Sequence, residues 1–400
     1  MPNIIDYVQT EMRTFSEKKL GAVDSLIFSQ LSYLHYNECV PDIFEEKDSV
    51  RLGDLYKAEY FENLFAKTHH PEKNRELFFA VAASPRFRDI HLNYYISEHD
   101  AHAQMQFSAI TFFINLDTMY VAYRGTDATI IGWKEDFNMA FAYPLPSQEA
   151  GLLYLENVAQ LATTCKKIIV GGHSKGGNIA VYSAMHCGTE AQKRVVQIYN
   201  HDGPGFLPEV LKGREYKRIE RVLYKTLPES SIIGILLHQQ DKFEVVKSLG
   251  FGVMQHDPYN WCVENGDFCY LEDLHKETLR TQKTINEWLS GLSHDQRKRF
   301  VDTLYGLIES TRARDYFDLT DDWLKAASRL LSAAKDLDPE LRRFVHSTIS
   351  ELVRISIRNR TQSDIISAPF DLWDGSDEGR SIAISGTTDY DFDVDVPDNL

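Results

Sequence analysis

The feature that most constrains the fold is residues 167–178, where an apolar run leads into a glycine-flanked serine. The β-branched residues 168–170 predict a buried strand, and the small and apolar residues after position 178 predict a helix. Ser174 lies between the two, with Gly172 and Gly176 on either side. A Gly-x-Ser-x-Gly pattern between a strand and a helix is typical of a nucleophile elbow, in which a tight turn presents the serine hydroxyl above a sheet.

The residue types around this turn match the geometry that it requires. Glycine at positions 172 and 176 would let the strand and the helix pass close to each other. The backbone N–H of Lys175 would stand at a helix N-terminus, where it could stabilise an oxyanion. An ordinary glycine-rich turn is the alternative. A phosphate-binding loop needs Gly-Lys followed by Ser or Thr, and the order Ser174-Lys175-Gly176 argues against one.

A second turn offers another candidate oxyanion donor. Residues 105–114 and 118–124 are rich in β-branched and aromatic residues and flank a short polar turn, which predicts a hairpin. The second run ends in Arg-Gly-Thr-Asp, and the backbone N–H of Thr126 could join that of Lys175 at an oxyanion. A plain strand-ending turn is the alternative.

Two carboxylates are candidates for the acid that would orient a catalytic histidine. Residues 195–199 predict a buried strand, and Asp202 follows in a glycine and proline turn, where catalytic groups of open α/β sheets gather. Residues 221–226 predict the next strand, and Glu229 follows it. We favour Asp202 because of its position at a strand end. Capping of its own turn is the alternative role for this aspartate.

His256 is the candidate general base. It lies in a glycine-bearing loop after Ser174 and after both acids, which satisfies the Ser, acid, His order of α/β-hydrolases. A serine hydroxyl needs such a base, because it is a poor nucleophile until an imidazole accepts its proton. His201 and His238 compete for this role, and His173, inside the elbow, is expected to point away.

Bulk composition excludes several classes of protein. A net charge of -16 with no basic run argues against a nucleic-acid partner. The five cysteines are an odd, scattered set without metal-ligand spacing, so we expect neither a disulfide nor a zinc framework, and we predict a reducing, cytoplasmic location. We expect no signal peptide, and the sequence contains no apolar stretch of about twenty residues. Membrane contact and oligomeric state stay open.

The pattern along the chain predicts an α/β fold in four parts. Residues 1–90 form a helical extension and residues 91–270 an α/β-hydrolase core. Apolar residues at helical spacing predict an all-helical region over 271–360. Residues 361–400 are strongly acidic and predict a disordered tail.

Six short motifs resemble the bacterial Mbeg-like family, a family of unknown function placed among the α/β-hydrolases. They are QFSA at 106–109, RGTD at 124–127, GWKEDF at 132–137, GHSKGGN at 172–178, DGPGF at 202–206 and QHDP at 255–258. The Arg-Gly-Thr strand end and the serine elbow are also similar to those of class 3 lipases. Those lipases would place the acid where this chain has Glu229 and no aspartate. The resemblance implies lipase-like or esterase-like chemistry on a substrate that it does not name.

These patterns predict a serine hydrolase that cleaves a carboxylic ester of a small molecule or a lipid. Ser174 would attack, His256 would move the proton, Asp202 would hold the imidazole, and the N–H groups of Lys175 and Thr126 would bind the oxyanion. We expect no cofactor and no metal. A thioesterase or peptidase could use the same three residues, and a catalytically silent fold could act as a binding module.

Overall fold

The computed structural model describes residues 1–66, 68–100, 102–126, 135, 138–139, 142–237, 242–310 and 339–366. The chain divides into two units, Met1–Arg360 and Thr361–Leu400. The first unit holds the architecture below, and of the second only residues 361–366 are described. The predicted acidic tail after residue 366 and the predicted helices within 311–338 lie outside the described residues.

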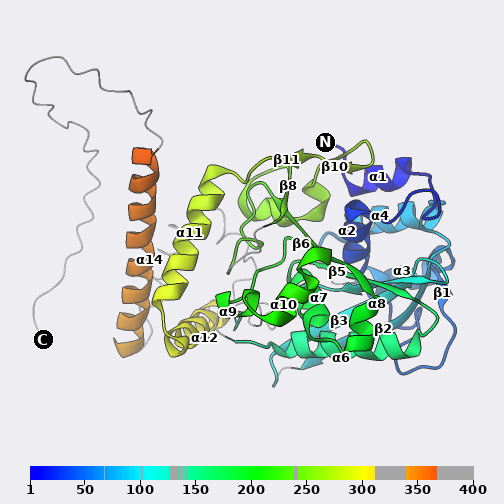
Figure 1. Cartoon of the computed structure of the whole chain (residues 1–400), viewed down its shortest axis with the longest axis horizontal. Helices are drawn as coiled ribbons and strands as arrows, with labels where there is room; N and C mark the ends of the chain where they lie inside the picture. The colour runs from blue at the N-terminus through cyan, green and yellow to red at the C-terminus, as the bar shows by residue number, and fades with distance from the viewer. Residues whose placement is uncertain are drawn as a thin grey trace, which may run out of the picture. The chain divides into compact units, whose positions relative to one another are not determined.

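A nine-stranded sheet organises the first unit (Figure 1). Its strands stand in the order β1-β2-β3-β4-β5-β6-β7-β8-β11. They are β1 Val50–Arg51, β2 His91–Asp100, β3 Met105–Phe113, β4 Thr118–Tyr123, β5 Lys167–His173, β6 Val195–His201, β7 Leu223–Pro228, β8 Glu244–Val246 and β11 Tyr270–Leu271. Strands β4 to β8 are parallel to one another, and the strands at both edges are antiparallel. The predicted hairpin is β3 and β4, so that prediction is confirmed.

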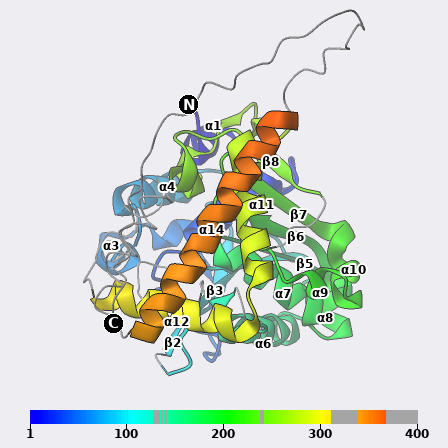
Figure 2. The same ribbon diagram turned by 90° about the vertical axis from the view of Figure 1, so that its left-hand side faces the viewer.

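Helices cover both faces of this sheet (Figure 2). One face packs against α1 Ile4–Thr10, α2 Ala22–Leu31 and α4 Pro71–Ala83, and the other against α6 Pro146–Leu161, α7 Lys175–His186, α8 Thr189–Arg194 and α10 Arg214–Ile219. Alternate residues of β4 are buried on opposite faces. Tyr120 and Ala122 pack in the core beneath α1, α2 and α4, and Val121 and Tyr123 pack in the core beneath α6, α7, α8 and α10. A strand buried on both faces reads as a continuous apolar run, which is the pattern seen in the sequence.

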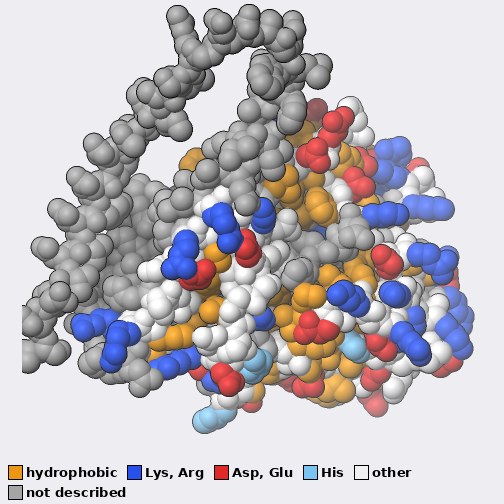
Figure 3. All heavy atoms as spheres, turned by 60° about the vertical axis from the view of Figure 1, so that its left-hand side comes forward, with side chains coloured by type: hydrophobic (Ala, Val, Ile, Leu, Met, Phe, Trp, Pro, Cys, Tyr) orange, Lys and Arg blue, Asp and Glu red, His pale blue; other side chains and the backbone are white. Residues whose placement is uncertain are grey.

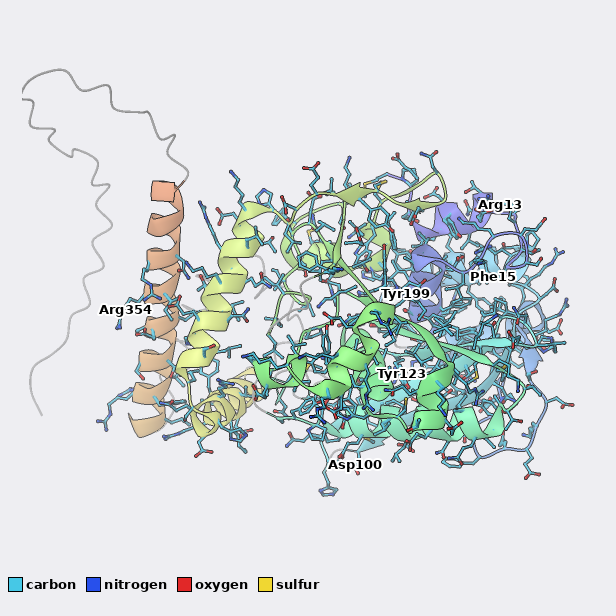
Figure 4. The ribbon with its side chains drawn as sticks, in the orientation of Figure 1. Arg13, Phe15, Asp100, Tyr123, Tyr199 and Arg354 are labelled. Atoms are coloured by element: carbon cyan, nitrogen blue, oxygen red, sulfur yellow. A yellow bond between two sulfur atoms is a disulfide. The ribbon has the colours of Figure 1, made fainter. Side chains whose placement is uncertain are left out.

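Two aromatic residues mark the interior of the sheet (Figure 4). Tyr123 is fully buried and its hydroxyl donates to the carbonyl of Gly151, 2.9 Å away in α6. Tyr199 in β6 stacks on His201 with ring centroids 5.8 Å apart. Tyr123 therefore ties the carboxyl end of β4 to α6, and Tyr199 packs against His201 at the carboxyl end of β6.

The remaining elements are short or lie in the C-terminal region. They are α3 Ala58–Leu64, α9 Pro208–Leu211, α11 Lys276–Gly291, α12 His294–Ser310, α14 Pro339–Ile366, the strands β9 Val263–Glu264 and β10 Asp267–Phe268, and the 3-10 helices Leu52–Leu55, Glu220–Val222, Gly252–His256 and Pro258–Asn260. Helices α11 and α14 contact through Trp288, whose Nε1 donates to the carbonyl of Thr348 at 3.0 Å. The mixed α/β class is confirmed, and the four-part division of the chain stays a prediction.

Two further observations concern the chain as a whole. Within the described ranges, no helix has the length and apolar character needed to cross a membrane. On the face drawn in Figure 3, Lys and Arg side chains lie among Asp and Glu side chains, with apolar side chains between them. The expectation that no nucleic acid binds stays a prediction.

Candidate active site

The glycine-flanked serine stands between a strand and a helix, as the sequence predicts. Strand β5 ends at His173, helix α7 begins at Lys175, and Ser174 is the residue between them. Its backbone has φ +59° and ψ −136°, a region that residues other than glycine rarely adopt. The Ser174 N–H donates to the carbonyl of His201, 2.9 Å away, so the turn is tied to the neighbouring strand β6. A strained backbone held in this way is a common feature of functional sites.

The flanking glycines are required by close backbone approach. A Cβ added at Gly172 would overlap the backbone of Gly176 and lie 2.7 Å from the nitrogen of Gly177. A Cβ at Gly176 would overlap the carbonyl oxygen of Tyr123. The residue types of the elbow therefore follow from strand β5, strand β4 and helix α7 meeting at one point.

Asp202 and His256 contact each other directly. The Asp202 Oδ2 and the His256 Nδ1 are 2.6 Å apart. The Asp202 side chain is fully buried, whereas that of His256 is one-fifth exposed. Because a carboxylate in this contact accepts, Nδ1 is the nitrogen that donates, and Nε2 is left as the ring nitrogen that can accept a proton. This is the tautomer that a serine hydrolase needs.

The second oxygen of Asp202 is also fixed. The Ser231 hydroxyl donates to Oδ1 at 2.5 Å, and the backbone N–H of Gly234 donates to the same atom at 3.1 Å. The Asp202 N–H donates to the carbonyl of Thr226 at 2.8 Å, and its φ is +50°. The carboxylate therefore has one orientation, with Oδ2 directed at the imidazole.

Glu229, the other candidate acid, is not brought to His256 by any described contact. Its Oε1 accepts from the N–H of Ser248 at 3.3 Å. Its own N–H donates to the carbonyl of Val246 at 3.1 Å, and its carbonyl accepts from the N–H of His275 at 2.7 Å. Glu229 thus joins the end of β7 to the segments after β8 and before α11.

The loop that carries His256 is held by its buried neighbour Gln255. The Gln255 Nε2 donates to the carbonyl of Gly250 at 2.9 Å, and its Oε1 accepts from the N–H of Ser230 at 2.6 Å. Its carbonyl accepts from the Nε1 of Trp261 at 2.7 Å. Fixing the residue before the histidine limits the positions that its imidazole can take.

His173 does not point away from the site, so that expectation is wrong. Its Nε2 lies 2.8 Å from the carbonyl oxygen of His256, and the two rings have centroids 4.4 Å apart. Its Nδ1 lies 3.2 Å from the hydroxyl of Tyr33. Burial, followed by the neighbouring His256 and His201, holds the pKa of His173 well below its usual value. A neutral His173 therefore donates from Nε2 to the His256 carbonyl and connects the elbow to the histidine loop.

His201 and His238 are the other candidates for the general base. The ring nitrogens of His201 lie 2.8 Å from the hydroxyl of Thr226 and 2.9 Å from that of Ser25. His201 is fully buried, and burial lowers its pKa to about 3, so it is unsuited to act as a base near neutral pH. His238 lies outside the described residues.

The end of strand β4 lies against the elbow. A Cβ added at Gly125 would lie 3.1 Å from the Cβ of Ser174 and 2.7 Å from the carbonyl oxygen of His173. Thr126, the next residue, is half-buried. The predicted oxyanion donors, the N–H groups of Lys175 and Thr126, thus belong to two segments that both adjoin Ser174. Asp127 and, apart from Glu135, residues 132–137 of the motifs lie outside the described residues.

The side chain of Lys175 is buried in an ion pair that the sequence does not reveal. Its Nζ lies 2.7 Å from Glu135 Oε2 and 3.2 Å from the carbonyl oxygen of Gln106. The other carboxylate oxygen of Glu135 accepts from the N–H of Ser147 at 2.9 Å. The lysine at the start of α7 is therefore matched by a buried carboxylate from the segment that follows β4.

One local disulfide is present, although the sequence predicts no disulfide framework. Cys262 and Cys269 form a disulfide across the hairpin of β9 and β10, a pairing that becomes visible only when the strand register is known. Together with Glu264 they are also the cluster of side chains, within the described ranges, that could hold a metal ion, but the disulfide engages both sulfur atoms. Cys39, Cys165 and Cys187 are buried and free.

A family model agrees with the resemblance that the motifs indicate. Among solved structures, the crystal structure of M37 lipase is similar to this chain with a TM-score of 0.35 and 16% identity, over 53% of this chain and 68% of that one. No curated protein matches the sequence. A family model described as Mbeg1-like matches residues 81–306, more than half of the chain, and includes Ser174, Asp202 and His256. The chain belongs to the Mbeg1-like family.

Proposed function

We propose that this protein is a serine hydrolase of lipase or esterase type, with an α/β-hydrolase core, that cleaves a carboxylic ester through an acyl-enzyme. The observation that carries the proposal is the 2.6 Å contact between His256 Nδ1 and Asp202 Oδ2 at the carboxyl edge of the sheet. The link from His173, the residue before Ser174, to the His256 carbonyl supports it from the other side.

Each residue has a defined part in the proposed reaction. His256 Nε2 takes the proton of the Ser174 hydroxyl while the serine oxygen attacks the ester carbonyl. The N–H groups of Lys175 and Thr126 stabilise the oxyanion of the tetrahedral intermediate. The imidazolium, held by Asp202, then gives its proton to the leaving alcohol, and water repeats the sequence to release the acid. No cofactor and no metal ion takes part.

A substrate panel tests the proposal. Wild type and Ser174→Ala are assayed on p-nitrophenyl esters of graded acyl length, on acyl thioesters and on short peptides. We expect ester hydrolysis with an initial burst, and a loss of about a thousandfold or more in Ser174→Ala. Preference for thioesters or peptides would move the assignment to another acyl group. Equal rates for wild type and Ser174→Ala would overturn the proposal, and a wild type inactive on the whole panel would favour the silent binding module.

A further inference from the structure

A buried lysine lies beneath the turn that carries Asp202. Lys225 in strand β7 is 2% exposed, and it pairs with Asn200 on the adjacent strand β6. Its Nζ donates to the carbonyl of Gly203 at 2.8 Å and to the carbonyl of Gly234 at 3.1 Å. A lysine is almost never fully buried without a specific reason.

The two carbonyls that Lys225 holds belong to the segments that position Asp202. Gly203 follows Asp202 in the chain, and Gly234 donates its own N–H to Asp202 Oδ1. One ammonium group therefore ties the turn that contains the carboxylate to the loop that orients it. The carbonyl of Thr226, the residue after Lys225 in β7, also accepts a hydrogen bond from the Asp202 N–H.

The charge of Lys225 acts on the same group. Burial lowers the pKa of this lysine to about 7, and the negative charge of Asp202 opposes that lowering. Among the described residues, the titratable groups that the contacts link to Asp202 are Lys225 and His256, with His173 and His201 beside them, and burial keeps these two histidines neutral near pH 7. Below about pH 7, Lys225 therefore carries a positive charge that interacts with the Asp202 carboxylate.

We propose that Lys225 is a positioning residue for the reaction, which holds Asp202 in place and offsets part of its negative charge. The inference rests on the proposed function of Ser174, Asp202 and His256. A negative charge beside an imidazole favours its protonated form in general, and a positive charge near the same carboxylate opposes that effect. Removal of the Lys225 charge should therefore make protonation of the imidazole easier.

The test compares two substitutions that separate charge from shape. Lys225→Gln removes the charge but keeps an N–H donor for the carbonyls, whereas Lys225→Arg keeps the charge in a different shape. The pH profile of kcat/KM is measured on a p-nitrophenyl ester with both variants. Lys167→Gln is the control, since it makes the same charge change on an exposed lysine at the other end of β5.

In Lys225→Gln we expect the acid limb of the profile to move to higher pH by about half a unit or more. We also expect kcat to fall at least tenfold with less than a twofold change in KM. Lys225→Arg should keep the acid limb of wild type even if its kcat falls, and Lys167→Gln should match wild type throughout. An unmoved acid limb in a folded Lys225→Gln, or an equal shift in Lys225→Arg, would overturn the inference. If wild type itself does not hydrolyse the ester, the proposed function is refuted instead.

Discussion

The Nδ1 of His256 lies 2.6 Å from the Oδ2 of Asp202, although 54 residues separate the two in the chain. Asp202 stands at the end of β6, and His256 ends a short 3-10 helix after β8. Strand β5, which leads into Ser174, pairs with β6. Because these strands are parallel, Ser174 and Asp202 lie at the same edge of the sheet, where Asp202 contacts His256.

Substitution of each candidate acid tests whether Asp202 or Glu229 orients His256. Asp202→Asn places an amide N–H donor where Oδ2 accepts from His256 Nδ1, which favours the wrong tautomer, and kcat is expected to fall about a thousandfold or more on an ester substrate. Glu229→Gln keeps an oxygen that can accept from the Ser248 N–H, so its kcat should stay within about threefold of wild type. Steady-state kinetics on both variants measure this, and a larger loss in Glu229→Gln than in Asp202→Asn would reverse the assignment.

Gly125 tests how closely the segment after β4 approaches the elbow. A methyl group in Gly125→Ala would overlap the Tyr33 hydroxyl and lie 2.7 Å from the carbonyl oxygen of His173, which cannot move without disturbing Ser174. We expect the free energy of unfolding to fall by about 1 to 3 kcal/mol. Gly291→Ala is the matched control, because nothing lies within 4 Å of the added group. Urea denaturation measures both, and equal stability of the two variants would contradict the described approach.

The buried pair of Lys175 and Glu135 predicts a non-additive mutant cycle. Both side chains are at most 1% exposed, so Lys175→Met leaves an unpaired buried carboxylate and should cost about 3 to 5 kcal/mol of unfolding free energy. Adding Glu135→Gln removes the stranded charge and should restore most of that loss.

The exposed pair of Lys193 and Glu190 serves as the control for this cycle, since its loss should cost less than about 1 kcal/mol. Denaturant unfolding of the two single variants and the double variant gives the coupling energy. A double variant no more stable than Lys175→Met alone would rule out the buried ion pair.

His201 predicts a loss of stability in acid. Its pKa is about 3 in the folded protein and near 6.5 when unfolded, so between these values the unfolded chain binds the extra proton and stability falls as pH falls. One extra proton bound by the unfolded chain changes the free energy of unfolding by about 1.4 kcal/mol per pH unit. In His201→Gln the slope of unfolding free energy between pH 5 and 6 should be smaller by about that amount. An unchanged slope would show that His201 is protonated in the folded protein.

Local patterns were sufficient to predict some parts of this structure. The elbow and the β3–β4 hairpin follow from short runs of β-branched residues and glycine, because strand and turn preferences act over a few neighbouring residues. The chain order of Ser174, Asp202 and His256 is likewise visible in the sequence.

Contacts between distant segments were not predictable in this way. The choice of Asp202 over Glu229 depends on where the His256 loop folds back, and the direction of His173 depends on Tyr33 beyond the end of α2. The buried positions of Lys175 and Lys225 contradict the usual exposure of lysine, and only the packing of Glu135 and of the Gly203 turn explains them.

Covalent labelling with a fluorophosphonate probe tests the central claim most directly. The probe reacts with a serine that a neighbouring base activates, and peptide mass spectrometry locates the adduct. We predict one adduct on Ser174 in wild type, no adduct in Ser174→Ala, and labelling slowed at least a hundredfold in His256→Ala. Labelling of Ser174→Ala at the wild-type rate, or an adduct on another serine, would contradict the assignment of Ser174 as the nucleophile.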